Sequence, residues 1–203
     1  MISTKYSIIM ISCFLSCLTS IYAQDGDKIL TVGHNTAHHP VTINMTQVQD
    51  HRIWQVNDLR KDLGLKPYHA HDQLHRTAQK RSDRARASWS ISHRRTGSQA
   101  YYSYPLIKKR FAQEWVQFSG KGTLFVENVG YGYIKCKKDD GTQDLIQAMQ
   151  STWRFFIAEK YKKYQAHYRS MINPNYQFAG VWAAIDLKHK TYYLTIHYSQ
   201  AIK

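Results

Sequence analysis

The order of apolar and polar positions divides the chain into an early helical part and a late part rich in strands. Between residues 46 and 63, apolar side chains recur largely every three or four positions, and Gly64 follows. This spacing predicts an amphipathic helix that ends before Gly64. Comparable patterns predict further helices over residues 72–88, 107–118 and 144–164. Aromatic and β-branched runs predict extended segments over residues 123–134, 178–185 and 191–198, the last two joined as a hairpin.

Residues 167–185 combine a polar segment, an Asn-Pro turn and an apolar run. Pro174 lacks a backbone N–H and restricts the residue before it, so a helix that precedes it ends there. The apolar residues 181–185 are typical of a buried strand, which the chain enters through Gly180. His167 therefore lies just before a helix-to-strand junction, where a side chain can be presented at the rim of a sheet.

The first 23 residues have the features of a secretory signal peptide. Lys5 precedes an apolar run over residues 8–18, and the small residue Ala23 precedes a polar segment. This arrangement predicts cleavage after Ala23 and a secreted or periplasmic protein. The apolar run is shorter than the roughly 20 residues that span a bilayer, so we expect no transmembrane segment after signal removal. The residues before Cys17 make a poor lipid-attachment signal.

The remainder of the chain divides into an N-terminal arm and one domain. Residues 24–45 mix Gly, Asp, Asn and Thr with short apolar pieces and have no helical period, which predicts an extended arm. The histidines of this arm, His34, His38 and His39, are interpreted as solvated rather than as metal ligands. Residues 46–203 are enough for one domain with a core of its own.

A formal net charge of +14 over 203 residues indicates anionic partners. Removal of Lys5 with the signal peptide reduces +14 to +13. Such a charge favours a lipid headgroup, an anionic envelope component or another polyanion, although basic residues are also typical of a solvated surface. We do not expect nucleic acid to be the physiological partner. The basic residues cluster at positions 80–86, 94–95, 108–110 and 160–163.

Signal removal leaves Cys136 as the one cysteine, so the mature chain can form no intramolecular disulfide. Its neighbours in the sequence are basic, which predicts a lowered pKa for the thiol. No histidine accompanies it in the sequence, and we do not expect Cys136 to be a catalytic nucleophile.

Five segments together resemble the CAP superfamily of SCP-like proteins, which includes cysteine-rich secretory proteins, venom antigens and plant pathogenesis-related proteins. These segments are residues 63–83, with a Gly turn, a Pro and a Leu/Ala-rich helix; Ser92-His93 followed by Thr96-Gly97; Glu127-Asn128-Val129; Trp153; and residues 167–181, which open on His-Tyr and run into Asn-Pro. The resemblance covers roughly residues 45–199. The chain lacks the disulfides of eukaryotic members, and in this it resembles the bacterial, single-domain members.

The resemblance implies an α+β fold, an α-β-α sandwich with a central antiparallel sheet, and a cleft where two histidines meet one or two carboxylates. His93, Glu127 and His167 match three of the family's four cleft positions. The fourth, a Glu in many members, falls on Phe156, and Glu159 one turn further along is a weak substitute.

Two imidazoles and a carboxylate are the ligand types of an open site for zinc or another divalent metal. In an enzyme, His93 and His167 would hold the metal, and Glu127 would polarise or deprotonate a water that attacks a peptide or ester bond. The same groups also suit a buried polar network without catalysis. His71 and His75, four residues apart on one helix face, are a rival pair with no evident third ligand, and ordinary solvated histidines are favoured there.

We therefore expect a secreted or periplasmic, non-enzymatic binder of lipid or envelope components. The aromatic residues 101–104 with Trp115 suit the hydrophobic groove that lipid or sterol binding in the family implies, and they suit core packing equally. Two alternatives remain open: a metal-dependent hydrolase that uses His93, Glu127 and His167, and a secreted polyanion-binding protein.

Overall fold

A four-stranded sheet forms the centre of the molecule. The computed structural model describes residues 22–23, 28–34, 39–94, 99–113, 116, 118 and 123–202. The sheet consists of β4 (His69–Ala70), β5 (Phe125–Tyr133), β6 (Phe178–Asp186) and β7 (Thr191–Ser199), in the order β4-β6-β7-β5. The pairs β6–β7 and β7–β5 are antiparallel, and the short β4 runs parallel to β6. The predicted strands over 178–185 and 191–198 are confirmed, and β5 is an edge strand.

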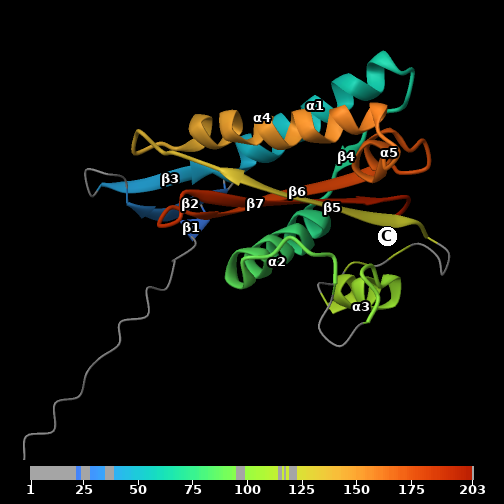
Figure 1. The fold of residues 1–203 in the computed structure, drawn as a ribbon, viewed down its shortest axis with the longest axis horizontal. Helices are drawn as coiled ribbons and strands as arrows, with labels where there is room; N and C mark the ends of the chain where they lie inside the picture. The colour runs from blue at the N-terminus through green and yellow to red at the C-terminus, as the bar shows by residue number, and fades with distance from the viewer. Residues whose placement is uncertain are drawn as a thin grey trace, which may run out of the picture.

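Helices cover both faces of this sheet (Figure 1). On one face lie α1 (Met45–Asp62), α4 (Thr142–Ala158) and α5 (Ala166–Ile172), and on the other lie α2 (Asp72–Ser88) and α3 (Tyr104–Gln113). The α+β class and the α-β-α sandwich expected from the sequence are thus confirmed. The predicted helix over 72–88 has the bounds of α2, and the one over 46–63 differs from α1 by a single residue at each end.

Two predicted helices end elsewhere in the structure. The helix expected over 107–118 begins at Tyr104, one residue before a proline in the first turn, where proline is favoured. It ends at Gln113, and Phe118 forms an isolated bridge to Ile202. The helix expected over 144–164 ends at Ala158 and continues only as the 3₁₀ turn η1 (Glu159–Tyr161).

The N-terminal region is more than a solvated arm. β1 (Tyr22–Ala23), β2 (Lys28–His34) and β3 (Pro40–Asn44) form a second antiparallel sheet. Alternate residues of β3, Val41 and Ile43, are fully buried and join the main core. The hydrophobic contacts of these two side chains explain why the range 24–45, expected to be an arm, packs against the domain in its described part. The predicted signal peptide lies outside the described residues, apart from Tyr22 and Ala23.

Among the described residues, no helix is both long enough and apolar enough to cross a bilayer. α4 and α1 instead contribute apolar side chains to the core above the sheet, including Leu145, Met149, Val48 and Val56. A smaller cluster of Ile107, Phe111 and Phe125 attaches α3 near the start of β5. The main core and the smaller cluster therefore hold the helices in place on the two faces of the sheet beside the edge strand β5.

The contact between α2 and the sheet depends on Gly180 in β6. A Cβ atom at this position would lie 2.2 Å from the carbonyl carbon of Leu74 and 2.4 Å from the backbone nitrogen of His75. Because both atoms belong to the α2 backbone, no side-chain rotation can relieve such a clash. The absence of a side chain at Gly180 is what allows α2 to lie this close to β6.

We expect Gly180→Ala to lower the free energy of unfolding by about 3 kcal/mol or more, since the whole helix must shift. Urea denaturation of the variant measures this loss. Gly64→Ala is the matched control: Gly64 has φ of +68° with no atom within 4 Å of an added Cβ, so only backbone strain of about 1 kcal/mol is expected. Equal losses in the two variants would contradict the close-packing argument.

Candidate functional site

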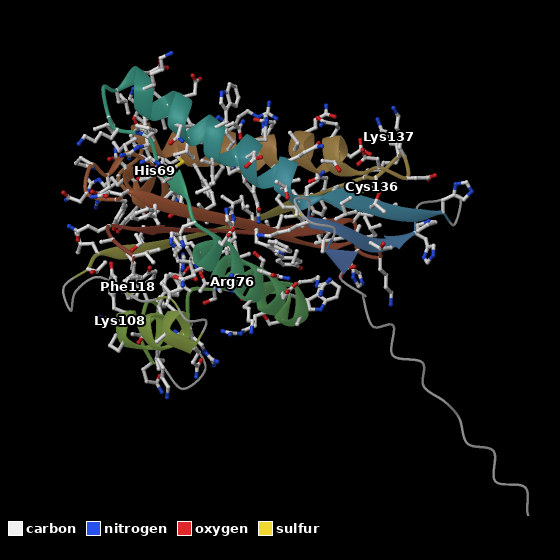
Figure 2. All side chains as sticks on the ribbon, turned by 180° about the vertical axis from the view of Figure 1, so that it is seen from behind. His69, Arg76, Lys108, Phe118, Cys136 and Lys137 are labelled. Atoms are coloured by element: carbon white, nitrogen blue, oxygen red, sulfur yellow. The ribbon has the colours of Figure 1, made fainter. Side chains whose placement is uncertain are left out.

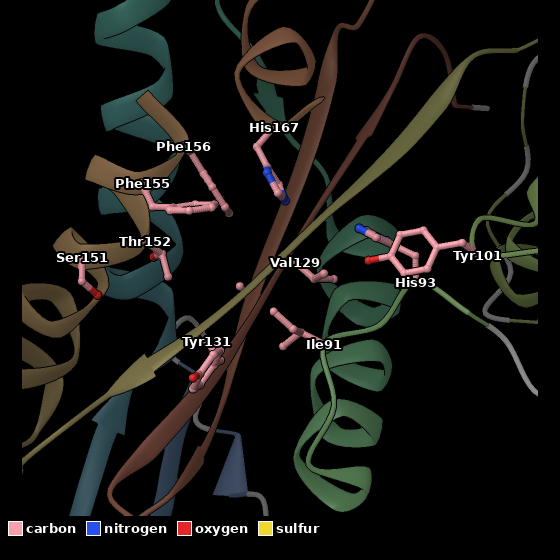
Figure 3. Close-up of a pocket in the computed structure, with 11 residues that line it drawn as sticks. Ile91, His93, Tyr101, Val129, Tyr131, Ser151, Thr152, Phe155, Phe156 and His167 are labelled. Carbon is pink, nitrogen blue, oxygen red and sulfur yellow. The ribbon is translucent and has the colours of Figure 1, made fainter. Parts of the chain in front are cut away.

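A pocket of about 360 Å³ straddles the edge strand β5. Figure 3 shows its lining residues on both sides of this strand. They come from β5 itself, from α4, from the first turn of α5 and from the chain that follows α2: Ile91, His93, Tyr101, Val129, Gly130, Tyr131, Ser151, Thr152, Phe155, Phe156 and His167. The structure thus brings two of the three predicted site residues, His93 and His167, to one pocket.

His93 is held by the carboxylate of Glu127. Its Nδ1 lies 2.9 Å from Glu127 Oε1, and its side chain is mostly buried. Since an ionised carboxylate only accepts hydrogen bonds, Nδ1 must carry the proton. In the neutral ring the lone pair is then on Nε2.

Glu127 itself lies behind His93, out of the pocket lining. Its side chain is fully buried, and besides His93 it accepts from His197 Nε2 at 3.0 Å and from Arg81 Nε at 3.4 Å. Burial on its own raises the pKa of the Glu127 carboxyl. Hydrogen bonds from His197 and His93, with the charge of Arg81, outweigh burial and hold this pKa well below its usual range. The geometry therefore favours an orienting role for Glu127 over the water-activating role that the hydrolase alternative gives it.

The sequence motifs did not identify His197 and Arg81 as parts of this network. His197 lies directly opposite Glu127 in the β5–β7 register, and its Nδ1 is 2.8 Å from Thr77 Oγ1. The signal was the strand register: once Glu127 pairs with His197, two polar side chains must share one face of the sheet. Arg81 was assigned only to a basic helix surface, yet its guanidinium is buried and also donates to the carbonyl oxygen of Ser92.

His167 has a carboxylate partner of its own, Glu159. Its Nδ1 lies 2.6 Å from Glu159 Oε1, while Glu159 Oε2 accepts from the backbone N–H of His167 at 2.8 Å and of Tyr168 at 3.3 Å. Phe156 stacks on the His167 ring, with centroids 4.4 Å apart. The candidate named as a weak substitute, Glu159, thus contacts the second histidine, and Phe156 supports the ring by packing.

The site therefore consists of two histidines that are each oriented by a buried carboxylate. In both rings Nδ1 faces the carboxylate, which places Nε2 on the opposite side of the ring. The two rings approach from opposite sides of β5 (Figure 3). Carboxylates behind histidines are also the usual support of imidazole ligands to a metal.

The fit to a metal ion is partial. Within the described residues, no group of three or more His, Cys, Asp or Glu side chains gathers as metal ligands. His93 and His167 offer two Nε2 atoms, and a water or a substrate oxygen would have to complete the coordination of zinc. The rival pair does not improve on this, because His75 is buried with Nδ1 3.0 Å from the backbone of Val181, and His71 packs against Phe178.

Cys136 lies outside this site. It is buried beside the β2–β3 hairpin, at the end of the molecule away from Lys108 and Phe118 (Figure 2). Burial, with a smaller effect of Asp144, raises the pKa of the thiol to about 11. The lowered pKa expected from the basic neighbours is therefore wrong, since those lysines are exposed while the sulfur is not.

The predicted aromatic groove is present in part. Tyr101 lines the pocket, and Tyr102 Oη accepts a hydrogen bond from the backbone N–H of Glu127 at 3.0 Å. Tyr104 is exposed, packed edge-on against Tyr102. Trp115 lies outside the described residues.

The fold and the site together define an α-β-α sandwich protein with a pocket at the sheet edge, flanked by two histidine–carboxylate pairs. A sequence profile of the CAP family, described as the cysteine-rich secretory protein family, matches residues 55–198. The chain belongs to this family, as the resemblance of its motifs implied. No curated protein sequence matches the chain significantly.

Solved structures agree with this fold. The chain is similar to an outer surface protein from Borrelia burgdorferi, with a TM-score of 0.56 and 13% identity, over 78% of this chain and 96% of that one. It is also similar to the CAP domain of enterococcal PrgA, with a TM-score of 0.53 and 17% identity, over 77% of this chain and 62% of that one. At these identities the likeness concerns the fold.

The depressed pKa of Glu127 predicts an acid-dependent contribution to stability. The unfolded carboxyl takes up its proton near the ordinary pKa of 4.5, whereas the folded one stays ionised to lower pH. The stabilisation is therefore present above pH 4.5 and is lost as the pH falls toward the folded-state pKa. We expect Glu127→Gln to lower the free energy of unfolding at neutral pH by about 3 kcal/mol and to flatten its acid decline, measured by urea denaturation.

Asp83→Asn is the matched control, because burial raises the pKa of Asp83 despite the opposing charge of Arg86. A raised carboxyl pKa acts with the opposite sign, so this variant should lose no stability at neutral pH and should decline in acid at least as steeply as the parent protein. An acid decline that is the same in Glu127→Gln and in the parent protein would refute the assignment.

Proposed function

We propose that the protein is an extracytoplasmic, non-enzymatic binding protein whose pocket holds the apolar part of a lipid or another amphiphilic envelope component. The observation that carries this proposal is the composition of the pocket. Its walls are largely apolar, and its polar groups are few, with His93 and His167 among them. Such a combination is typical of sites for small amphiphiles.

The apolar wall suits an acyl chain. Ile91 and Val129 lie on the α2 side of β5, and Phe155 and Phe156 lie on the α4 side. Phe155 is 52% exposed, an unfavourable state for a phenyl ring that a bound chain would relieve. His93 and His167 line the same pocket and would contact the polar head of such a ligand.

An extracytoplasmic location is supported by the N-terminal sequence and by the charge. The predicted signal peptide would export the chain, and the net charge of +14 favours the anionic surfaces of a cell envelope. The similar structure from Borrelia burgdorferi is that of an outer surface protein.

Phe155→Ser should weaken the binding of a dansyl-labelled fatty acid by about tenfold, because an aromatic contact with the chain is removed. Fluorescence titration measures the change. Tyr133→Ser is the control, since Tyr133 is 73% exposed on β5 outside the pocket lining. Absence of saturable binding to the parent protein, or equal affinity in the two variants, would reject the acyl-chain assignment.

A metal-dependent hydrolase is the second candidate, and the carboxylate-oriented histidines favour it. The backbone groups of Leu124 and Ile134, just outside the two ends of β5, form hydrogen bonds with Gln200 and Lys190 at the ends of β7. Even-numbered residues of β5 therefore direct their backbone N–H and C=O groups to β7, and the odd-numbered Val129 and Tyr131 direct theirs to the free edge. Among the described residues, no partner takes these groups. An extended peptide could pair with this edge and carry a carbonyl group past the two Nε2 atoms.

For this candidate, zinc bound by His93 and His167 would supply a Lewis acid for a peptide or ester carbonyl. Calorimetric titration should then give micromolar zinc binding that disappears in a folded His93→Ala/His167→Ala variant. His189→Ala is the control, because His189 pairs with Asp186 in the β6–β7 turn, outside the pocket lining. Zinc binding that is absent, or retained in the double variant, would eliminate the metal-dependent reaction.

A further inference from the structure

The loop between α4 and α5 exposes lysines interspersed with tyrosines to solvent. Residues 160–164 read Lys-Tyr-Lys-Lys-Tyr, and all five are exposed. Tyr161 is 83% exposed and Tyr164 is 80% exposed, the two most exposed of the large hydrophobic side chains that the structure describes. Because these tyrosine rings are almost fully exposed, they contribute no hydrophobic stabilisation to the core. Packing in the core therefore does not explain why tyrosine stands at these two positions.

Hydrogen bonds fix the base of this loop. The N–H of Lys162 donates to the carbonyl oxygen of Glu159 at 2.9 Å, and Gln165 Nε2 donates to the carbonyl oxygen of Lys160 at 2.8 Å. The Glu159 side chain binds the first turn of α5 through His167. These hydrogen bonds hold the loop in one conformation. Its base, at Glu159, is bonded to His167 of the pocket wall.

The surface charge of the segment that contains this loop has one sign. From Leu145 to Ile185 the sequence contains a single acidic residue, Glu159, which is buried under His167. The cations of the loop and of the start of α5 are exposed: Lys160, Lys162, Lys163 and Arg169. No carboxylate within this segment can neutralise them at the surface, so they present a positive field to an anionic partner.

The loop adjoins the mouth of the pocket. Lys162 Nζ lies 4.7 Å from the ring centroid of Phe155, and Phe155 is a half-exposed residue of the pocket wall. Whatever binds the loop therefore comes close to the opening through which a ligand would enter.

We propose that residues 160–164 dock the protein onto an anionic lipid bilayer with the mouth of the pocket turned toward the membrane. The proposal rests on the proposed lipid-binding function, to which it adds the partner surface. The lysines contact lipid phosphates, and the rings of Tyr161 and Tyr164 enter the headgroup region, where tyrosine is favoured. The preformed loop lets binding proceed with little loss of backbone entropy.

The aromatic rings distinguish a bilayer from a soluble polyanion. A phosphate or sulfate polymer needs cations alone, and its contacts are lost with salt. A bilayer interface also takes up amphipathic rings, whose transfer is far less sensitive to salt. Two exposed tyrosines and three lysines within five residues match the second case.

The test is co-sedimentation of the full protein with vesicles of phosphatidylglycerol and phosphatidylcholine, compared with phosphatidylcholine alone. We expect binding only to the anionic vesicles. Replacing Lys160, Lys162 and Lys163 by glutamine should weaken it roughly 100-fold, at about fivefold for each lysine. Tyr161→Ser/Tyr164→Ser should weaken it by about tenfold or more and leave the salt dependence of binding unchanged.

The matched control replaces Lys135, Lys137 and Lys138 by glutamine. These lysines are also exposed and change the net charge by the same amount, but they lie at the other end of the molecule, where Figure 2 labels Lys137. This variant should lose only a few-fold in affinity, since its effect is long-range and screened. Equal losses in the two lysine variants would overturn the proposal, because net charge alone would then explain binding.

Three further outcomes are informative. If the tyrosine variant binds as the parent does and soluble polyphosphate displaces the vesicles completely, the loop is a polyanion site and membrane docking is rejected. Solution binding of the dansyl fatty acid is measured in the same variants and should be unchanged by the loop substitutions. Loss of vesicle binding with retained fatty-acid binding assigns docking to the loop, whereas vesicle binding without any fatty-acid binding retains docking and rejects the pocket function.

Discussion

The architecture of the site depends on one buried carboxylate. Glu127 balances the buried guanidinium of Arg81, joins β5 to His197 of β7, and fixes the ring of His93. Desolvating an ion is costly unless opposite charges and donors surround it, and here three donors do so. Since these donors come from α2, from the central sheet and from the chain after α2, the same ionic network both holds the layers together and sets which nitrogen faces the pocket.

The sequence predicted the elements well where one hydrophobic period dominated. Residues 72–88 form α2 with the predicted bounds, because Leu74, Ala78 and Ala85 recur at helical spacing on its buried face. α4 is shorter than its pattern, because Glu159 turns back to accept hydrogen bonds from His167 and Tyr168 and the chain reverses. That reversal is a tertiary effect. The pattern of apolar positions along the helix therefore does not predict where α4 ends.

The site was predicted by its residue types and only partly by its geometry. The motif resemblance supplied His93, Glu127 and His167, and their chemistry left open a water-activating Glu127 or a buried polar network. In the structure Glu127 bonds two histidines and an arginine, and neither His197 nor Arg81 was among the predicted partners. His197 could be found only from the register of two strands distant in the sequence. Glu159 was judged a turn too far along a helix, and the 3₁₀ turn after Ala158 removes that objection.

The position of β5 at the sheet edge explains how both histidines reach one pocket. Successive side chains of a strand point to opposite faces, so Glu127 reaches toward α2, while Asn128 and the open position at Gly130 face α5 and α4. In the interior of a sheet these two faces are separated by neighbouring strands. At an uncovered edge they meet, and a ligand can contact His93 from one layer and His167 from the other. At the same edge Lys162 lies over the ring of the half-exposed Phe155, so the wall of the pocket adjoins the loop that follows α4.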